Sequence, residues 1–478
     1  MSKTTTATYR TLMAKQFRPR GRIKVTLTSG SDSWTFTESD LVRLDAKTAV
    51  DPLSRRLPTE SLTFSVLDFD GNYDPSNPDG KWAAIDQNAK IEVEYGIMNG
   101  SAVIWLSEKD KYILDGRPSW QRGVATFLAS SSLLHLTQTY YKASDTPGTL
   151  YDIALDMIYE AGAPDYSIWY GLSNYAADIP LPVDSIRNNL QRIAQAAGCT
   201  LCTKHGVITI APYEEDDIVD GAYSMTLKDI VQDEDVVQKT NKVYTVKGYQ
   251  YERKNADAET IVYQQAVYTI GNGETIHIEY DAVQDPVLTV SSGTVVSANL
   301  YARGADIVMD YPGVYEITIT GKRIGQTGTL VQAVVSTDTE GSTLIINNPL
   351  INSITQLNGA IYKAANYLHH RITHTLQTRG NPEQEPLDGL NFVTEYGVSA
   401  HGLILSNEVI FDGILHGKLD VLSLNEGEDN EAATLQDIDE YFVQDSNGDQ
   451  ILVVGNAPYI SAHTADEMDD MAEAVLGY

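Results

Sequence analysis

Short segments in which apolar and polar residues alternate fill the first third of the chain. From Ile23 onward such segments follow one another, with Gly, Asp, Asn or Pro between them and no helical pattern. They read IKVTL, SWTFT, SLTFSVLD, IEVEYGI, AVIWLS, KYILDG and VATFLAS. Alternation with period two places neighbouring side chains on opposite faces of a strand. The pattern therefore predicts a first β domain over residues 20–140, a compact sandwich or barrel closed by short hairpins.

The hydrophobic period changes after residue 145. Apolar residues recur at helical spacing over 150–161 and again over 183–197, where Gly198 provides a stop. Two short strand patterns, CTLCT and VITIAPY, follow around the turn KHG. Residues 141–236 are therefore predicted to form a small α+β domain.

Strand patterns return after residue 237 and continue, with one interruption, to residue 424. The interruption is a helix, because apolar residues recur every three or four positions from Ile354 to Leu368. Period two resumes directly afterwards, in RITHTLQTR. The stretch 238–424 is therefore predicted to be mainly β, with one helix inserted.

The two ends of the chain differ in charge. Residues 1–19 form an arm with basic residues and no acid, which is expected either to reach a neighbouring subunit or to be a frayed terminus. Residues 425–478 begin with an acidic linker and contain the hairpin pattern YFVQDSNGDQILVVG around an Asn-Gly turn. A lone hairpin is not stable by itself, so this segment is expected to dock on the body or on another protein.

Size and charge narrow the class of protein. A chain of 478 residues is expected to form three or four domains. Its formal net charge of -31 argues against binding to nucleic acid, because phosphate contacts require Lys and Arg. A negative surface would let DNA pass without sticking, or would simply keep the protein soluble. No apolar run approaches the length of a membrane span, and MSKTTTATYR lacks the apolar core of a secretion signal, so we expect assembly in the cytoplasm.

One loop comes nearest to a metal site, although we predict none. In DFDGNYDPSNPDG, the oxygen-bearing residues Asp68, Asp70, Asn72 and Asp74 occupy alternate positions, as in a calcium loop. The twelfth position is Asp79 rather than a bidentate Glu, and Asx turns explain the same residues. QDSNGDQ is a second loop of this kind.

The cysteines and histidines give no stronger site. Cys199 and Cys202 form a CxxC motif that follows a helix and enters a strand, so the two thiols should point to opposite faces; only His205 lies near as a further ligand. We predict inert, reduced thiols. A second group, His369, His370 and His374, spans a predicted helix-to-strand junction without an HExxH glutamate.

No catalytic motif is present in the sequence. We find no GxSxG, no GxxxxGK[ST] and no GxGxxG between a strand and a helix. The 65 carboxylates are too many to single out a glycosidase pair. The sequence therefore predicts no enzyme, no catalytic residue and no cofactor.

Four runs resemble the central hub proteins of phage tails, also called baseplate hub or tail-associated proteins. In that family a helix, a hairpin and a strand of the form VTVKGY lead into a second barrel, and a turn of the form RGNPxxEPGD precedes the closing strands. Here Leu387 stands where that turn has glycine, so the chain departs from the family pattern at this turn. The runs are DFDGNYDPSNPDGKWAAIDQNAKIEVEYGI, VDSIRNNLQRIAQAAGCTLCTKHGVITIAPY, MTLKDIVQDEDVVQKTNKVYTVKGYQY and RITHTLQTRGNPEQEPLDGLNFVTEYGVSAHGLILSNEVIFDGILHGKLDVLSL.

The resemblance implies a mainly β, multidomain fold in which two β-barrel-like domains flank the small α+β domain. The first barrel is then 20–140, the second is 237–290 with 346–424, and 291–345 is an inserted β module. It further implies a homotrimer whose six barrels form a ring that caps the tail tube, adapts its symmetry and closes the DNA channel. The expected partners are the tail tube, distal tail proteins, the tape-measure protein and a fibre, spike or tip protein held by 425–478. The expected location is the tail tip or baseplate of a virion, contractile or not.

Two other functions remain open. A receptor- or glycan-binding adhesin would account for the 28 tyrosines, because Tyr suits contact surfaces, but such a protein normally carries a secretion signal. A peptidoglycan hydrolase would account for the many carboxylates. The roughly fifty residues after the body are expected to be too few for an enzyme domain.

Overall fold

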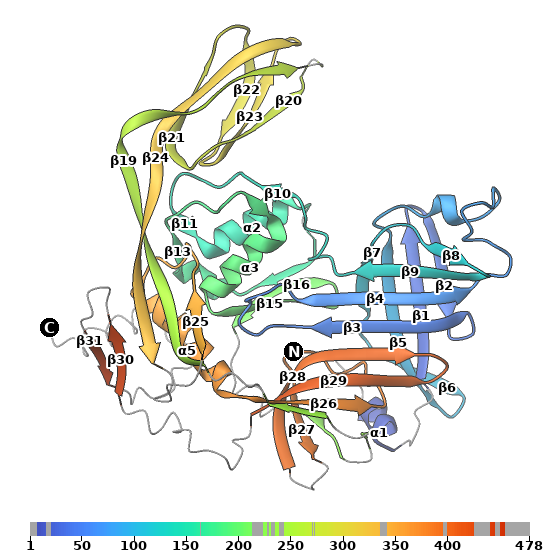
Figure 1. Cartoon of the computed structure of the whole chain (residues 1–478). Helices are drawn as coiled ribbons and strands as arrows, with labels where there is room; N and C mark the ends of the chain where they lie inside the picture. The colour runs from blue at the N-terminus through green and yellow to red at the C-terminus, as the bar shows by residue number, and fades with distance from the viewer. Residues whose placement is uncertain are drawn as a thin grey trace.

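The computed structural model consists of a body of β-sheets and helices from which a long β arm projects (Figure 1). It describes residues 7–15, 21–162, 164–212, 223–226, 229–230, 235–238, 243–269, 271, 273–334, 342–394, 399–424, 440–444 and 450–454. Strands dominate, as the alternating pattern predicts. No helix of these residues is long and apolar enough to cross a membrane.

The seven alternating segments of the first β domain all form strands, and the domain also contains β3 and β8, which lie outside those segments. In β4 the inward residues Leu62, Phe64 and Val66 are buried, and the residues between them are more exposed. The rings of Phe64 and Phe127 stack with centroids 4.6 Å apart at the centre of the core. The elements are β1 (Gly21–Ser29), β2 (Asp32–Thr37), β3 (Leu41–Ala49), β4 (Thr59–Leu67), η1 (Trp82–Ala84), β5 (Lys90–Asn99), β6 (Ala102–Trp105), β7 (Asp110–Leu114), β8 (Ser119–Gln121) and β9 (Val124–Ser130).

The last β domain continues the sheet of the first. Strand β28 pairs antiparallel with β3, from Ser406 opposite Ala49 to Phe411 opposite Leu44. The described strands of both domains therefore form one open 15-stranded sheet, where the sequence predicts two separate barrels. Alternation fixes which side chains face inward but not which strand lies next to which. The strands of the last domain are β17 (Tyr223–Ser224), β18 (Asp235–Gln238), β26 (Ile372–Thr378), β27 (Gly389–Val393), β28 (Ser399–Phe411) and β29 (Leu415–Ser423).

Three helices and several short strands form the α+β part next to this sheet (Figure 1). Each helix starts where a hydroxyl caps it: Thr149, Ser185 and Ser353 each accept a hydrogen bond from the amide three residues later. The helices bury their apolar faces in one shared core. The elements are β10 (Thr139–Tyr140), β11 (Gly148–Thr149), α2 (Leu150–Glu160), β12 (Tyr166–Ile168), η2 (Tyr170–Asn174), β13 (Ala176–Ala177), β14 (Asp184–Ser185), α3 (Ile186–Ala196), β15 (Cys199–Lys204), β16 (Val207–Pro212) and α5 (Ile354–His369).

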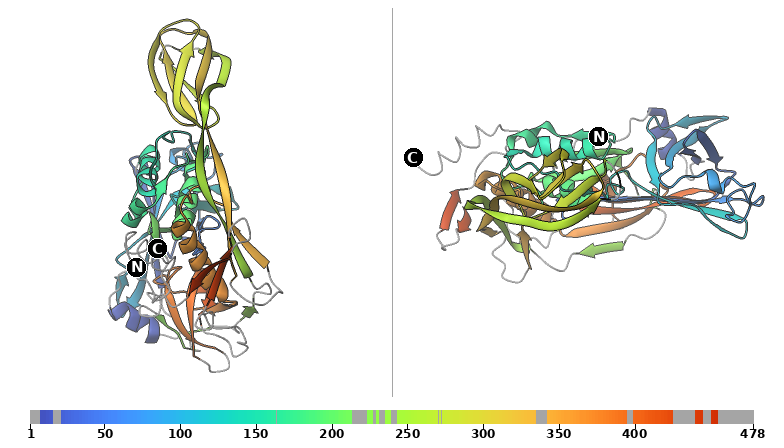
Figure 2. Two further views of the ribbon diagram at one scale, coloured as in Figure 1. Left: turned by 90° about the vertical axis from the view of Figure 1, so that its left-hand side faces the viewer. Right: turned by 90° about the horizontal axis from the view of Figure 1, so that it is seen from above.

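The arm is a two-stranded ribbon that ends in a small sandwich (Figures 1 and 2). Strands β19 (Val243–Thr269) and β24 (Gly313–Val334) pair antiparallel along its length, and β25 (Ser342–Ile346) pairs parallel with the base of β19. The tip contains β20 (Thr275–Glu279), β21 (Val283–Val290), β22 (Val295–Leu300) and β23 (Gly304–Met309) around its own core. Residues 243–290, assigned from the sequence to the second barrel, thus lie in this arm together with most of 291–345.

Both ends of the described chain fold back on the body. Helix α1 (Ala7–Lys15) buries Tyr9 in the core of the first domain, and Arg10 Nε lies 2.5 Å from Glu383 Oε1 of the last domain. Strands β30 (Glu440–Gln444) and β31 (Gln450–Val454) pair as the predicted hairpin, and β30 continues the sheet beside β24. The Asn-Gly turn itself lies outside the described residues.

The shared sheet makes a prediction about stability. Phe411 is 3% exposed and packs in the core of the first β domain although it belongs to a strand of the last. Phe411→Ala is expected to lower the free energy of unfolding by about 3–5 kcal/mol. Urea unfolding followed by tryptophan fluorescence reports it, because the first domain holds most of the tryptophans: Trp34, Trp82, Trp105 and Trp120.

The matched control is Tyr268→Ala in the arm, where the ring is 67% exposed. It is expected to change stability by less than about 0.5 kcal/mol. A Phe411 variant that unfolds like this control would contradict the shared core.

Candidate functional site at the junction of three domains

A tight turn places His205 where three domains meet. Lys204 and Val207 are cross-strand partners in the β15–β16 hairpin, so His205 and Gly206 form a two-residue turn with φ of 51° and 80°. Glycine adopts this backbone freely, and a Cβ at position 206 would lie 2.6 Å from Lys111 Cβ in β7. The hairpin tip is therefore pressed against the first β domain.

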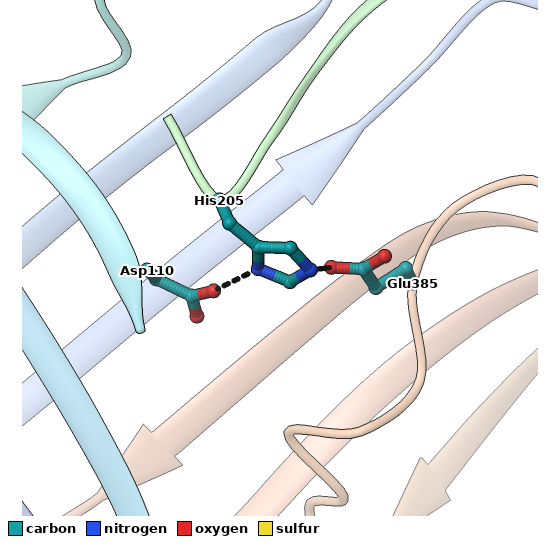
Figure 3. Close-up of side chains that lie close together, drawn as sticks. All are labelled: Asp110, His205 and Glu385. Carbon is teal, nitrogen blue, oxygen red and sulfur yellow. Dashed lines mark hydrogen bonds and ion pairs between the residues drawn. The ribbon is translucent and has the colours of Figure 1, made fainter. Parts of the chain in front are cut away.

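Three carboxylates surround the imidazole of His205 (Figure 3 shows two of them). Its Nδ1 lies 3.1 Å from Asp110 Oδ1 at the start of β7. Its Nε2 lies 3.0 Å from Glu108 Oε2, in the β6–β7 loop, and 3.0 Å from Glu385 Oε1, in the β26–β27 loop. His205 and Asp110 are each 16% exposed, and Glu385 is 12% exposed, so the group is largely removed from solvent.

Asp110, His205 and Glu385 line a cavity of about 40 Å³. A fourth carboxylate, Glu60 of β4, lines this cavity too and is 5% exposed. Burial raises the pKa of Glu60 well above its ordinary value, and the nearby charges of Asp110 and Glu385 raise it further. Thr203 and His205 partly offset this increase. The junction thus contains several acids around one imidazole.

The loop that supplies Glu385 contains Leu387, which stands where the turn of the resembled family has glycine. Leu387 adopts φ of 76°, a left-handed conformation that glycine accepts and a branched side chain resists. Two backbone hydrogen bonds to Ile404 hold the loop: the Leu387 amide donates to Ile404 O, and the Ile404 amide donates to Asp388 O. The Asp388 side chain accepts a hydrogen bond from the Glu385 amide at 3.0 Å. Burial, together with the nearby charge of Glu385, raises the pKa of Asp388 to about 6. The strained loop thereby fixes the position of Glu385.

The residues of the candidate calcium loop cap turns. Asp68 accepts hydrogen bonds from the amides of Asn72 and Tyr73, both at 2.8 Å, and Asp74 accepts from the amide and hydroxyl of Ser76. These contacts are the Asx turns that the sequence offers as the alternative. Among the described residues, the group of metal-ligating side chains that comes together is Asp110, His205 and Glu385 instead.

The cysteines are buried, free thiols on β15. Burial raises the pKa of Cys199 to about 12 and that of Cys202 to about 11, so both stay protonated and unreactive at neutral pH. In the other histidine group, α5 ends at His369 and β26 begins at Ile372, which separates His370 from His374. The His374 ring packs edge-on against Phe392 at 4.9 Å. The weaker loop QDSNGDQ, with Asp445, Asn447 and Asp449, lies mostly outside the described residues.

Sequence reasoning missed the junction because its members are distant in the chain. Asp110, His205 and Glu385 belong to three domains, and none stands in a motif with metal or catalytic spacing. The two local signals were the KHG turn and the leucine in place of glycine at 387. Each signal indicates a constrained backbone, but neither predicts which acidic side chains lie next to it.

The raised pKa of Glu60 predicts a pH-dependent stability. The folded protein holds a proton that the unfolded chain releases above about pH 4.3, so the Glu60 carboxyl costs stability as the pH rises. In EDTA, Glu60→Gln is expected to raise the melting temperature at pH 8 and to change it less at pH 5. Thermal unfolding at both pH values measures this difference.

The control is Glu279→Gln, which replaces an exposed carboxylate of the arm and should shift neither melt. A Glu60 variant that is equally affected at both pH values would show that the carboxyl is already ionised without cost.

Comparison with known proteins gives matches of structure but not of sequence. No protein-family model matches the chain, and no curated protein sequence matches it. A tail protein from Neisseria meningitidis MC58 is similar, with a TM-score of 0.45, 10% identity and coverage of 84% of this chain and 96% of that one. The 43 kDa tail protein of prophage MuSo2 from Shewanella oneidensis has a TM-score of 0.46 and 14% identity, and the match covers 84% of this chain and 98% of that one. A Francisella PdpA–VgrG complex has a TM-score of 0.41 and 10% identity, and the match covers 92% of this chain and 74% of that one. These three similar structures are thus two phage tail proteins and a VgrG complex, all at low sequence identity.

Proposed function

We propose that the chain is a non-enzymatic hub protein of a phage tail tip or baseplate, which trimerises into a ring at the end of the tail tube. The observation that carries this proposal is the pairing of β3 with β28. Through it, one chain presents two β domains side by side in a single sheet rather than as separate beads on a linker. Two of the four sequence runs that resemble tail hubs, the first and the last, belong to the two joined β domains.

The joined pair gives a simple route to symmetry adaptation. A rigid unit of two β domains, repeated three times about an axis, offers six similar surfaces to a six-fold tube above while keeping three-fold symmetry below. A flexible linker between the domains would not hold them at a fixed spacing. Here nine-residue β3 and thirteen-residue β28 fix that spacing through a ladder of backbone hydrogen bonds.

The charge of the chain fits the wall of a DNA conduit. With a formal net charge of -31, the surface repels phosphate and offers few counterion-displacing contacts. DNA could therefore pass through a central channel without being held. The same ring would close the channel before ejection and nucleate the tube, with the distal tail and tape-measure proteins as neighbours.

The arm supports a second, adhesive function. Its tip exposes Tyr268 and Tyr311, each 67% exposed, and Val314, which is the cross-strand partner of Tyr268. Aromatic rings held on a rigid sheet are suited to contacts with proteins or sugars. A receptor- or glycan-binding role of the tip is compatible with the hub body, and it is the alternative if the body does not assemble.

The first test is the solution mass and negative-stain image of the chain, alone and with its tail-tube protein. We expect three chains of 52.5 kDa each in one particle, with a central channel, that caps the end of tubes. Light scattering after size exclusion measures the mass. A monomer that does not bind tubes but does bind glycans would contradict the hub proposal and favour the adhesin.

The second test removes residues 425–478, the segment expected to hold a fibre, spike or tip protein. The truncated chain is expected to keep its oligomeric mass and tube capping, because the strands of the joined sheet end at Ser423. It is expected to lose co-sedimentation with the fibre or spike protein. Retention of that partner by the truncated particle would place the docking surface elsewhere on the chain.

A further inference from the structure

The two glutamates at His205 Nε2 are spaced as ligands of one ion. Glu108 Oε2 and Glu385 Oε1 each lie 3.0 Å from this nitrogen. Two ligand atoms about 2.1 Å from a metal ion, at angles of about 90–109°, lie roughly 3.0–3.4 Å apart. A single N–H points at one acceptor at a time, so one proton on Nε2 does not satisfy both carboxylates.

Asp110 is placed to select the form of the imidazole that binds metal. It lies 3.1 Å from Nδ1, on the opposite side of the ring from Glu385 (Figure 3). A proton on Nδ1 that is donated to Asp110 leaves the lone pair of Nε2 facing the two glutamates. Carboxylates commonly hold metal-ligating histidines in this way.

Glu60 supplies an independent sign that the cavity takes a cation. Its side chain lines the cavity and is 5% exposed. Its Oε2 makes no hydrogen bond of good geometry to a described group, and Thr203, which approaches the carboxylate, is neutral. Other buried carboxylates of the junction have an arginine: Asp51 pairs with Arg55 at 2.9 Å, and Glu383 pairs with Arg10. No described basic side chain forms such an ion pair with Glu60. The cavity of about 40 Å³ has room for an ion and a water molecule.

We propose that this cavity binds one divalent transition metal ion, with His205 Nε2, Glu108 and Glu385 as ligands and Asp110 as the group that orients the imidazole. An imidazole among carboxylates suits Zn²⁺ or Mn²⁺ better than Ca²⁺, which prefers oxygen ligands alone. Glu60 faces the cavity as the remaining carboxylate. Partial exposure of Glu108, at 37%, leaves a path for the ion to enter.

The ion would connect three domains at one point. Glu108 comes from the first β domain, His205 from the α+β hairpin and Glu385 from the last β domain. Binding to the folded state alone stabilises it by mass action. The ion would therefore act as a cross-link that holds the hairpin tip and the strained loop against β7.

The test uses the full chain, stripped with EDTA and dialysed into chelator-free buffer, and titrated with ZnCl₂ by calorimetry. We expect one Zn²⁺ per chain and, at a hundredfold excess over Kd, a melting temperature higher by about 2–5 °C. CaCl₂ at the same concentration should give neither effect. The absence of Zn²⁺ binding tighter than about 100 μM would overturn the proposal.

Variants locate the ion. His205→Asn keeps a residue that tolerates the left-handed turn, and Glu385→Gln keeps the shape of the loop. Each is expected to weaken Zn²⁺ binding at least tenfold while circular dichroism and particle mass stay unchanged. Weakening by Glu385→Gln alone still supports the site if His205→Asn misfolds. Unchanged affinity in a folded His205→Asn chain would overturn it.

The matched control is His277→Asn, which removes another histidine–carboxylate pair. His277 Nδ1 lies 2.7 Å from Asp306 Oδ1 in the arm, and the His277 side chain is 61% exposed. This variant is expected to bind Zn²⁺ as the unaltered chain does. Equal loss of binding in this control and in His205→Asn would indicate nonspecific binding and would overturn the site.

Discussion

The pairing of β3 with β28 is the constraint on which the architecture depends. These strands lie more than 350 positions apart in the chain, yet their backbones form one ladder, and the side chains of Val409 and Phe411 fill the core of the first domain. Closing so large a loop costs entropy, which the contacts of the α+β part and α5 help to offset by holding the intervening segments in place. The same pairing joins the two domains that supply Asp110 and Glu385 to the junction around His205.

Much of the fold follows from the period of the hydrophobic pattern. The seven alternating segments of the first domain, the helices α2, α3 and α5, and the hairpin around KHG form where their patterns predict them, whereas β3, the strand that pairs with β28, lies outside those segments. The pairing of strands does not follow from this pattern. The segment NKVYTVKGYQY has the pattern of a barrel strand, but its described part, 243–251, forms the base of the arm and pairs with β24. Local alternation contains no information about that choice.

The candidate site was accessible to sequence reasoning only through its backbone. A positive φ at His205 follows from the two-residue turn with Gly206, and a strained Leu387 follows from the missing glycine. That these two loops meet Asp110 and Glu60 depends on packing among three domains. Conversely, the loop with Asp68 has an attractive spacing, yet its carboxylate accepts hydrogen bonds from its own backbone. Spacing along the chain predicts convergence only when one element carries all the ligands.

The register shifts in the arm have a mechanical consequence. The β19–β24 ladder shifts between Asn255 and Glu259 and again between Ile261 and Tyr263, and such irregularities bend a ribbon locally. From Glu259 to the end of β19 the strand rises about 35 Å, at roughly 3.3 Å per residue. A tilt of about ten degrees at the first shift would therefore carry the tip sideways by about 6 Å. A small bend at the register shifts is thus amplified into a large displacement at the far end of the ribbon.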